Sequence, residues 1–268
     1  MALSELTYDR AGAGEPVVLI HGIGHRRQAW EPVFDQLAAS YDVIAVDLAG
    51  FGESPAYVDG VDYTMDNACK DLAANFAAWG IERPHVVGNS LGGAVCLELG
   101  ARGLASSVTV LSPAGFFGRF ERLEPFALLS MMRLASQLPD PVLHAVSRSA
   151  IGRRMVGFLL YAHPERVSAD ATYGDSLGMK HAAAFGRTIK AGLGYKFSAP
   201  IPVPTTVAWG TRDKLLRYRQ AAVAQRQLPG SVHVPLPNCG HVPMIDDPEL
   251  VISVIEATIG RANPAKAA

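Results

Sequence analysis

The sequence has few cysteines, and their pattern excludes two kinds of stabilising site. Its 268 residues include only three, Cys69, Cys96 and Cys239. Their number is odd, they are widely spaced, and no CxxC or histidine-rich stretch accompanies them, so neither a disulfide framework nor a zinc site is indicated. We expect all three to be small buried residues.

The chain also lacks an excess of charge of either sign. It has 24 Lys and Arg against 25 Asp and Glu, a formal net charge of −1. This balance gives no reason to expect nucleic acid as a partner. Apolar residues make up 49% and charged residues 18% of the chain, which is typical of a globular protein with a well-buried core.

Long apolar runs are missing as well. No segment approaches about 18 uninterrupted apolar residues, so no membrane span is predicted. The first residues, MALSELTYDR, lack the basic stretch and apolar run of a secretory signal. We expect a soluble cytoplasmic protein that acts on a small molecule, and the sequence gives no oligomeric state.

Short apolar, β-branched runs alternate with helical patterns along most of the chain. Runs that are apolar throughout are typical of strands buried on both faces. The expected strands are 16–20, 42–47, 84–89, 107–112, 204–210 and 231–236. The expected helices are about 28–39, 65–79, 91–101, 216–228 and 248–259. Strand followed by helix, repeated, predicts an α/β fold with a mostly parallel central sheet flanked by helices.

The alternation stops between about residues 116 and 199. This stretch contains helical patches such as FALLSMMRLASQL and RRMVGFLLYA, and no clear strand. It is too long for a connection and too apolar for a linker, so it predicts a helical lid inserted before the penultimate strand. The expected organisation is a core of residues 1–115 and 200–262, a lid of 116–199 and a flexible tail of 263–268.

The insertion is also more basic than the rest of the chain. Between residues 115 and 200 there are 11 Lys and Arg against 6 Asp and Glu, an excess of +5. Such an excess suits acidic substrates, and a solvated outer face explains it equally well.

Reactive side chains follow three of the expected strands. Ser90 follows 84–89, Asp213 follows 204–210, and His241 follows 231–236. Because the carboxyl ends of parallel strands lie at one edge of a sheet, we expect the three to meet there. A histidine can take the serine proton during attack, and an aspartate can hold the imidazole in the required tautomer. Asp213 would alternatively suit a helix cap.

Ser90 lies in the stretch VVGNSLGGA, within Gly88-x-Ser90-x-Gly92. Glycines relieve the crowding of a sharp turn from strand to helix. With the chain order Ser, Asp, His, this pattern resembles the nucleophile elbow of the α/β-hydrolase superfamily. The resemblance covers nearly the whole chain except the lid, and is to the lidded branch that includes esterases, perhydrolases and carbon–carbon bond hydrolases. It implies an oxyanion hole formed by the backbone N–H groups of Ile23 and Leu91.

The resemblance and the apolar lid together predict a serine hydrolase. The expected substrate is a small to medium, largely apolar ester or related acyl compound, cleaved through an acyl-serine intermediate. The mechanism requires no metal and no organic cofactor. The residues expected to line the substrate pocket are Gly22, Asn89, Met131, Met132 and Val242.

Two alternatives remain open. Carbon–carbon hydrolases of vinylogous diketones resemble this chain at VGNSLGG. Their pattern has a Gly-rich loop after the HG pair and an aromatic residue after the histidine, where this chain has Ile23-Gly24-His25 and Val242. A receptor-like binding protein with little turnover is the second alternative, because receptors of this fold can retain the triad. Ser90 argues against dehalogenases and epoxide hydrolases, which use a carboxylate at the elbow.

Several residues near these motifs favour structural roles. By the same resemblance, His21 organises the oxyanion loop, and residues 47–54 form a DxxGxGxS scaffold turn. His25, Arg26 and Arg27 are expected to flank the pocket mouth as solvated basic residues.

Overall fold

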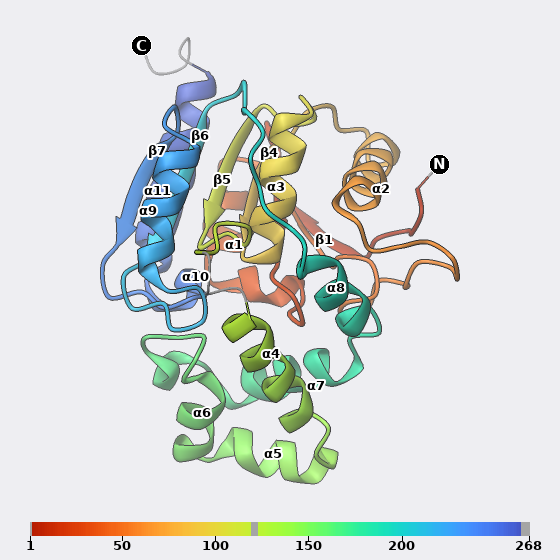
Figure 1. Ribbon diagram of the computed structural model, residues 1–268, viewed down its shortest axis with the longest axis vertical. Coiled ribbons are helices and arrows are strands. Elements are labelled where there is room, and N and C mark those ends of the chain that lie inside the picture. The colour runs from red at the N-terminus through yellow and green to blue at the C-terminus, as the bar shows by residue number, and fades with distance from the viewer. Residues whose placement is uncertain (1, 119–122, 264–268) are drawn as a thin grey trace.

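The computed structural model describes residues 2–118 and 123–263 and contains a seven-stranded sheet with helices on both faces (Figure 1). The strand order is β1-β3-β2-β4-β5-β6-β7, and all neighbours are parallel except β1 and β3. The strands are β1 (Tyr8–Ala11), β2 (Pro16–Ile20), β3 (Asp42–Val46), β4 (His85–Asn89), β5 (Ser107–Leu111), β6 (Thr205–Gly210) and β7 (Val232–Leu236). This architecture confirms the predicted α/β-hydrolase fold class.

The sheet separates two apolar layers. In β2, Val18 and Ile20 belong to one layer while Val17 and Leu19 belong to the other, because successive side chains of a strand point to opposite faces. Helices α2 (Met65–Ala78), α3 (Leu91–Ala101) and α9 (Ala221–Gln227) contribute to the first layer, and α1 (Glu31–Ala38) and α11 (Pro248–Ala262) to the second.

Short helical turns complete the core. They are η1 (Arg27–Trp30) before α1, η3 (Tyr218–Gln220) before α9, and α10 (Pro243–Asp246) before α11. The expected helices 28–39 and 216–228 therefore each begin as a 3-10 turn.

Five helices separate β5 from β6 in the described chain. They are α4 (Leu123–Ala135), α5 (Asp140–Arg148), α6 (Ala150–Gly157), α7 (Ala169–His181) and α8 (Phe185–Gly192), with the short turn η2 (Pro164–Arg166) before α7. Helices α4 to α7 lie beyond the edge of the sheet toward which the parallel strands run (Figure 1). The chain thus has helices where a lid was predicted. Of the predicted tail, residues 264–268 lie outside the described residues.

The cysteines are free and buried. Burial raises the pKa of Cys69 and that of Cys239 to about 12, so both stay protonated near neutral pH. None of the helices in the described ranges is long and apolar enough to cross a membrane.

Candidate active site

Ser90 forms the turn between β4 and α3 in a conformation that residues with a side chain rarely adopt, with φ 55° and ψ −113°. The glycines around it explain why the turn fits. A Cβ on Gly88 would lie 2.3 Å from the carbonyl oxygen of Gly92, and a Cβ on Gly92 would lie 2.1 Å from that of Ile20. Helix α3 therefore begins in direct contact with the strands, and only glycine fits at these two positions.

His241 and Asp213 form a buried pair on the loops after β7 and β6. The His241 Nδ1 lies 2.8 Å from the Asp213 Oδ2. The other carboxylate oxygen accepts from the backbone N–H groups of Leu215 and Leu216, at 2.9 and 2.8 Å. Asp213 thus accepts hydrogen bonds from the N–H groups of the following turn and also bonds the His241 imidazole. The His241 Nε2 is buried and has no partner among the described residues.

Asn89 connects the serine turn to the histidine loop. Its Nδ2 donates to the backbone oxygen of His241 at 2.8 Å, across 152 residues of chain, and to that of Leu111 at 3.0 Å. Ser90 and His241 line the same cavity. The structure therefore brings the three predicted residues together at the carboxyl edge of the sheet.

The two predicted oxyanion donors belong to segments that flank Ser90. Leu91 is the first residue of α3, so its N–H has no acceptor within the helix. Ile23 follows Gly22, where an added Cβ would lie 3.2 Å from the Ser90 Cβ. The loop that carries Ile23 thus packs directly against the serine.

His21 holds this loop in place through its two ring nitrogens. It is fully buried; its Nε2 accepts from the Leu48 N–H at 3.0 Å, and its Nδ1 lies 2.7 Å from the Gly22 oxygen and donates to it. Burial lowers the pKa of His21 to about 4, so the ring is neutral near pH 7 and suits structural bonding rather than proton transfer.

The predicted solvated positions of His25, Arg26 and Arg27 are wrong. Arg27 is 11% exposed and its Nη1 lies 2.6 Å from the buried Asp47 carboxylate. The Arg26 Nε donates to Asp175 at 3.1 Å, and His25 lines the cavity with 9% of its surface exposed. For His25 and Arg26 the reason is α7, which carries Asp175 and covers this loop from a distant part of the sequence. Arg27 pairs instead with Asp9, Asp47 and Glu53.

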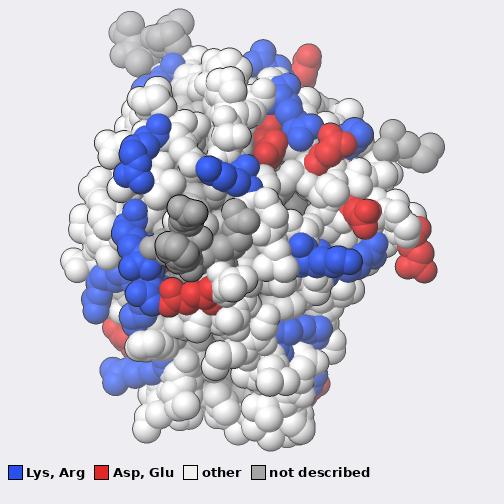
Figure 2. Space-filling model, in the orientation of Figure 1, with Lys and Arg blue, Asp and Glu red and all other residues white. Residues whose placement is uncertain are grey.

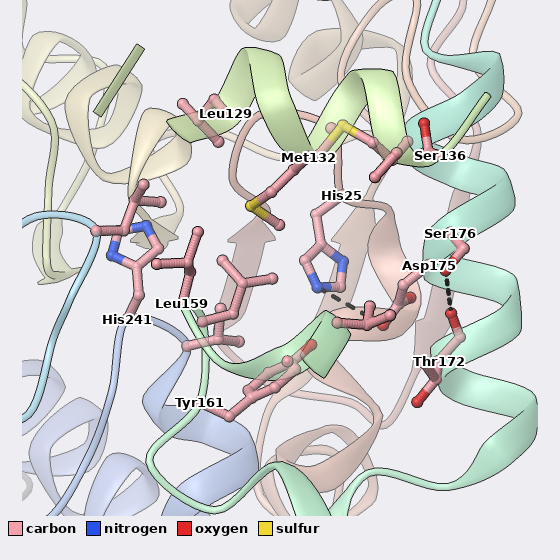
Figure 3. Close-up of a pocket in the computed structure, with 18 of the residues that line it drawn as sticks. His25, Leu129, Met132, Ser136, Leu159, Tyr161, Thr172, Asp175, Ser176 and His241 are labelled. Carbon is pink, nitrogen blue, oxygen red and sulfur yellow. Dashed lines mark hydrogen bonds and ion pairs between the residues drawn. The ribbon is translucent and has the colours of Figure 1, made fainter. Parts of the chain in front are cut away.

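A cavity of about 480 Å³ extends from Ser90 and His241 into the helical insertion (Figure 3). The five residues expected to line a pocket, Gly22, Asn89, Met131, Met132 and Val242, all line it. Most other lining residues are apolar and come from the insertion, for example Leu128, Leu129, Val146, Leu159 and Leu160. The polar residues Ser136, Thr172 and Asp175 also line it and were not expected. His25, which was expected at the pocket mouth, lines it as well.

Residues 17–254 match the model of the Alpha/beta hydrolase family. A 2-hydroxy-6-oxo-6-(2'-aminophenyl)hexa-2,4-dienoic acid hydrolase of Metapseudomonas resinovorans is 30% identical over 91% of this chain and 84% of its own length. A pimeloyl-[acyl-carrier protein] methyl ester esterase of Aeromonas hydrophila is 27% identical over 95% of this chain and 99% of its own. The crystal structure of an esterase from Rhodococcus is similar with a TM-score of 0.76 at 25% identity, covering 97% of this chain and 96% of that one.

Proposed function

Since the chain belongs to the alpha/beta hydrolase family, we propose that it is a serine hydrolase of the carboxylesterase type. Its substrate would be a small to medium, largely apolar ester or related acyl compound. One observation carries the proposal: Ser90, held in a strained turn, lines the same cavity as His241, whose Nδ1 is 2.8 Å from Asp213. The similarity to an esterase from Aeromonas hydrophila supports the reaction type, and the apolar lining of the cavity supports the substrate class.

In the first half of the reaction, the Ser90 hydroxyl attacks the ester carbonyl carbon while the His241 Nε2 takes its proton. Asp213 stabilises the imidazolium that forms. The N–H groups of Ile23 and Leu91 donate to the oxyanion of the tetrahedral intermediate, and each such donor contributes about 3 kcal/mol.

The imidazolium then gives its proton to the leaving alcohol, which completes the first half and leaves an acyl-Ser90 ester; the second half begins with water. A water molecule then attacks this ester while His241 takes one of its protons. Collapse of the second tetrahedral intermediate releases the carboxylic acid and returns the proton to the Ser90 oxygen.

Carbon–carbon bond hydrolysis of a vinylogous diketone is the second candidate. It is favoured by the relative from Metapseudomonas resinovorans, which is named as a dienoic acid hydrolase and is 30% identical. Val242 after the histidine, in place of an aromatic residue, favours the esterase.

The test combines a substrate series with covalent labelling. The protein is assayed with para-nitrophenyl esters of increasing acyl length and with a vinylogous diketone, and labelled with a fluorophosphonate. We expect ester turnover and labelling in the wild type, and loss of both, by more than about a thousandfold in kcat/KM, in Ser90→Ala. Ser112→Ala, which changes the serine after the neighbouring strand β5, is the matched control and should retain both.

Two results would contradict the esterase proposal. Turnover of the diketone alone would favour the carbon–carbon hydrolase. A folded wild-type protein that neither labels nor turns over any ester would favour a binding protein.

A further inference from the structure

His25 presents a buried N–H group that has no acceptor among the described residues. The residue is 9% exposed, and its Nε2 is buried without a partner. Its Nδ1 accepts from the Arg26 backbone N–H at 3.1 Å, so the ring proton is on Nε2. Buried donors in proteins nearly always have an acceptor, and His25 lines the cavity, where a ligand can supply one.

The turn after the oxyanion loop aims His25 into the cavity. The backbone N–H of His25 donates to the Gly22 oxygen at 3.2 Å. Gly24 between them has φ +71°, a conformation that glycine adopts without steric cost. A Cβ on Gly24 would lie 2.4 Å from the Met179 side chain of α7. The close packing of α7 on this turn holds the ring in place.

Asp175 on α7 faces the same nitrogen. Its Oδ2 is 3.9 Å from the His25 Nε2, while its Oδ1 accepts from the Arg26 Nε at 3.1 Å. A gap of 3.9 Å is too long for a hydrogen bond, yet one oxygen atom about 2.8 Å from each would bridge the two. Figure 3 shows this pair on the α7 side of the cavity, away from His241.

Three hydroxyl groups of this wall already donate their protons within the protein. Those of Ser136, Thr172 and Ser176 donate to backbone oxygens three or four residues earlier in the chain, at 2.7 to 2.9 Å. Among the described residues, the donors that remain on this wall are the His25 Nε2 and the Tyr161 hydroxyl, beside several acceptors. A substrate hydroxyl matches this set because it can accept from His25 and donate to Asp175 at once.

A carboxylate matches the pair less well. It has no proton for Asp175 and would lie beside that residue's negative charge. The cavity residue that suits a carboxylate is Arg153 on α6, whose Nε is buried without a partner among the described residues. A carboxylated substrate is therefore the competitor that an experiment must include.

We infer that His25 and Asp175 form a subsite for a hydroxyl group on the acyl chain, so that esters of hydroxylated carboxylic acids are the preferred substrates. This inference rests on the proposed function of Ser90. The hydroxyl accepts from the His25 Nε2 and donates to the Asp175 Oδ2, while the remaining chain contacts the apolar wall.

The test compares methyl octanoate with methyl octanoates that carry one hydroxyl group at successive carbons, and with monomethyl octanedioate as the carboxylated competitor. Chromatography of the released acid gives kcat/KM for each. In the wild type, at least one hydroxylated ester should exceed methyl octanoate about tenfold, and should also exceed the octanedioate. His25→Leu should lower that ratio to about one, whereas Met132→Leu, in the apolar wall, should keep it. The ratio is the readout because a change beside the oxyanion loop affects all the esters alike.

A binding experiment separates this inference from the proposed function. Calorimetry with Ser90→Ala should give a Kd about tenfold lower for the best hydroxylated ester than for methyl octanoate. If the wild type cleaves none of the esters while Ser90→Ala still binds with this preference, the proposed function fails and the subsite stands. The subsite is overturned if methyl octanoate or the octanedioate is preferred over every hydroxylated ester, or if His25→Leu keeps the ratio.

Discussion

Ser90 adopts a backbone conformation that glycine reaches without strain. Replacing the side chain by hydrogen should release this strain, while Ser90→Ala should keep it. We predict that Ser90→Gly is more stable than Ser90→Ala by about 1 kcal/mol in free energy of unfolding, after the greater freedom of glycine in the unfolded chain is subtracted. Urea denaturation of the two variants measures the difference. Equal stabilities would mean that the turn carries no strain.

His21 predicts a loss of stability in mild acid. Its pKa is about 4 in the folded protein because the ring is buried, against about 6.5 in an unfolded chain. Between these values the unfolded state binds a proton that the folded state does not. The free energy of unfolding should therefore fall as the pH drops from about 6.5 to 4, by up to about 3 kcal/mol.

The matched variant for this effect is His21→Gln, which has no group that titrates in this range. Denaturation curves at several pH values should show a shallower decline for the variant than for the wild type. Parallel declines would assign the acid sensitivity to other groups.

At the residue scale, the sequence predicted the positions of those side chains that depend only on the sheet. Ser90, Asp213 and His241 each follow a strand, and the parallel order of the strands sets where they meet. His25 was misjudged because its burial depends on α7. Arg26 beside it contacts Asp175 across 149 residues, and no local pattern in HGIGHRR reports such a contact.

At the scale of elements, the close contact of α3 with β2 constrains the site. A Cβ on Gly92 would lie 2.1 Å from the Ile20 oxygen and 2.6 Å from that of His21, and backbone atoms cannot move aside cheaply. We predict that Gly92→Ala lowers the free energy of unfolding by more than about 3 kcal/mol. Thermal or chemical denaturation measures this loss.

Gly186 in α8 provides the control, because no atom lies within 4 Å of its Cβ position. Gly186→Ala should leave stability unchanged or raise it by up to about 1 kcal/mol, since alanine favours helix. If Gly92→Ala changed the free energy of unfolding as little as Gly186→Ala, the packing described for the turn would be contradicted.

Elements that contain an apolar run were predictable, whereas β1 and α7, which lack one, were not. The apolar strands and the helices that cover them were expected within a few residues. Strand β1 was missed because three of its four residues are exposed, which leaves no apolar alternation to detect. Helix α7 was missed for a similar reason, since only Thr172 and Met179 are buried along it.

At the scale of the whole molecule, the insertion exposes an apolar surface. Figure 2 shows few charged side chains over the lower part of this face, where the insertion lies. Its exposed apolar residues include Leu123, Met131, Leu134, Leu138, Val142, Ile151, Met155, Val156 and Phe158. Four of them, Met131, Leu138, Met155 and Val156, also line the cavity, so the cavity opens to solvent through this surface.

This opening predicts how acyl length affects turnover. A charge at Met155, which is 74% exposed and lines the cavity, should hinder long apolar chains and leave acetate esters unaffected. We predict that Met155→Glu lowers kcat/KM for an octanoate ester about tenfold relative to an acetate ester.

Ile151 on the same helix is 73% exposed but is not among the lining residues. Ile151→Glu should therefore keep the ratio of octanoate to acetate turnover. If Met155→Glu and Ile151→Glu lower the ratio of octanoate to acetate turnover equally, the apolar surface as a whole, rather than this opening, determines how acyl length affects turnover.

The bond from the Asn89 amide to the His241 backbone joins positions 152 residues apart. A ribosome that has completed the Ser90 turn has still to synthesise more than half of the chain before His241, the proposed base, exists. If Ser90 and His241 act as proposed, the nascent protein should therefore gain hydrolase activity only when β7 docks at the edge of the sheet. The rate at which turnover recovers during refolding should therefore report when β7 docks on the sheet.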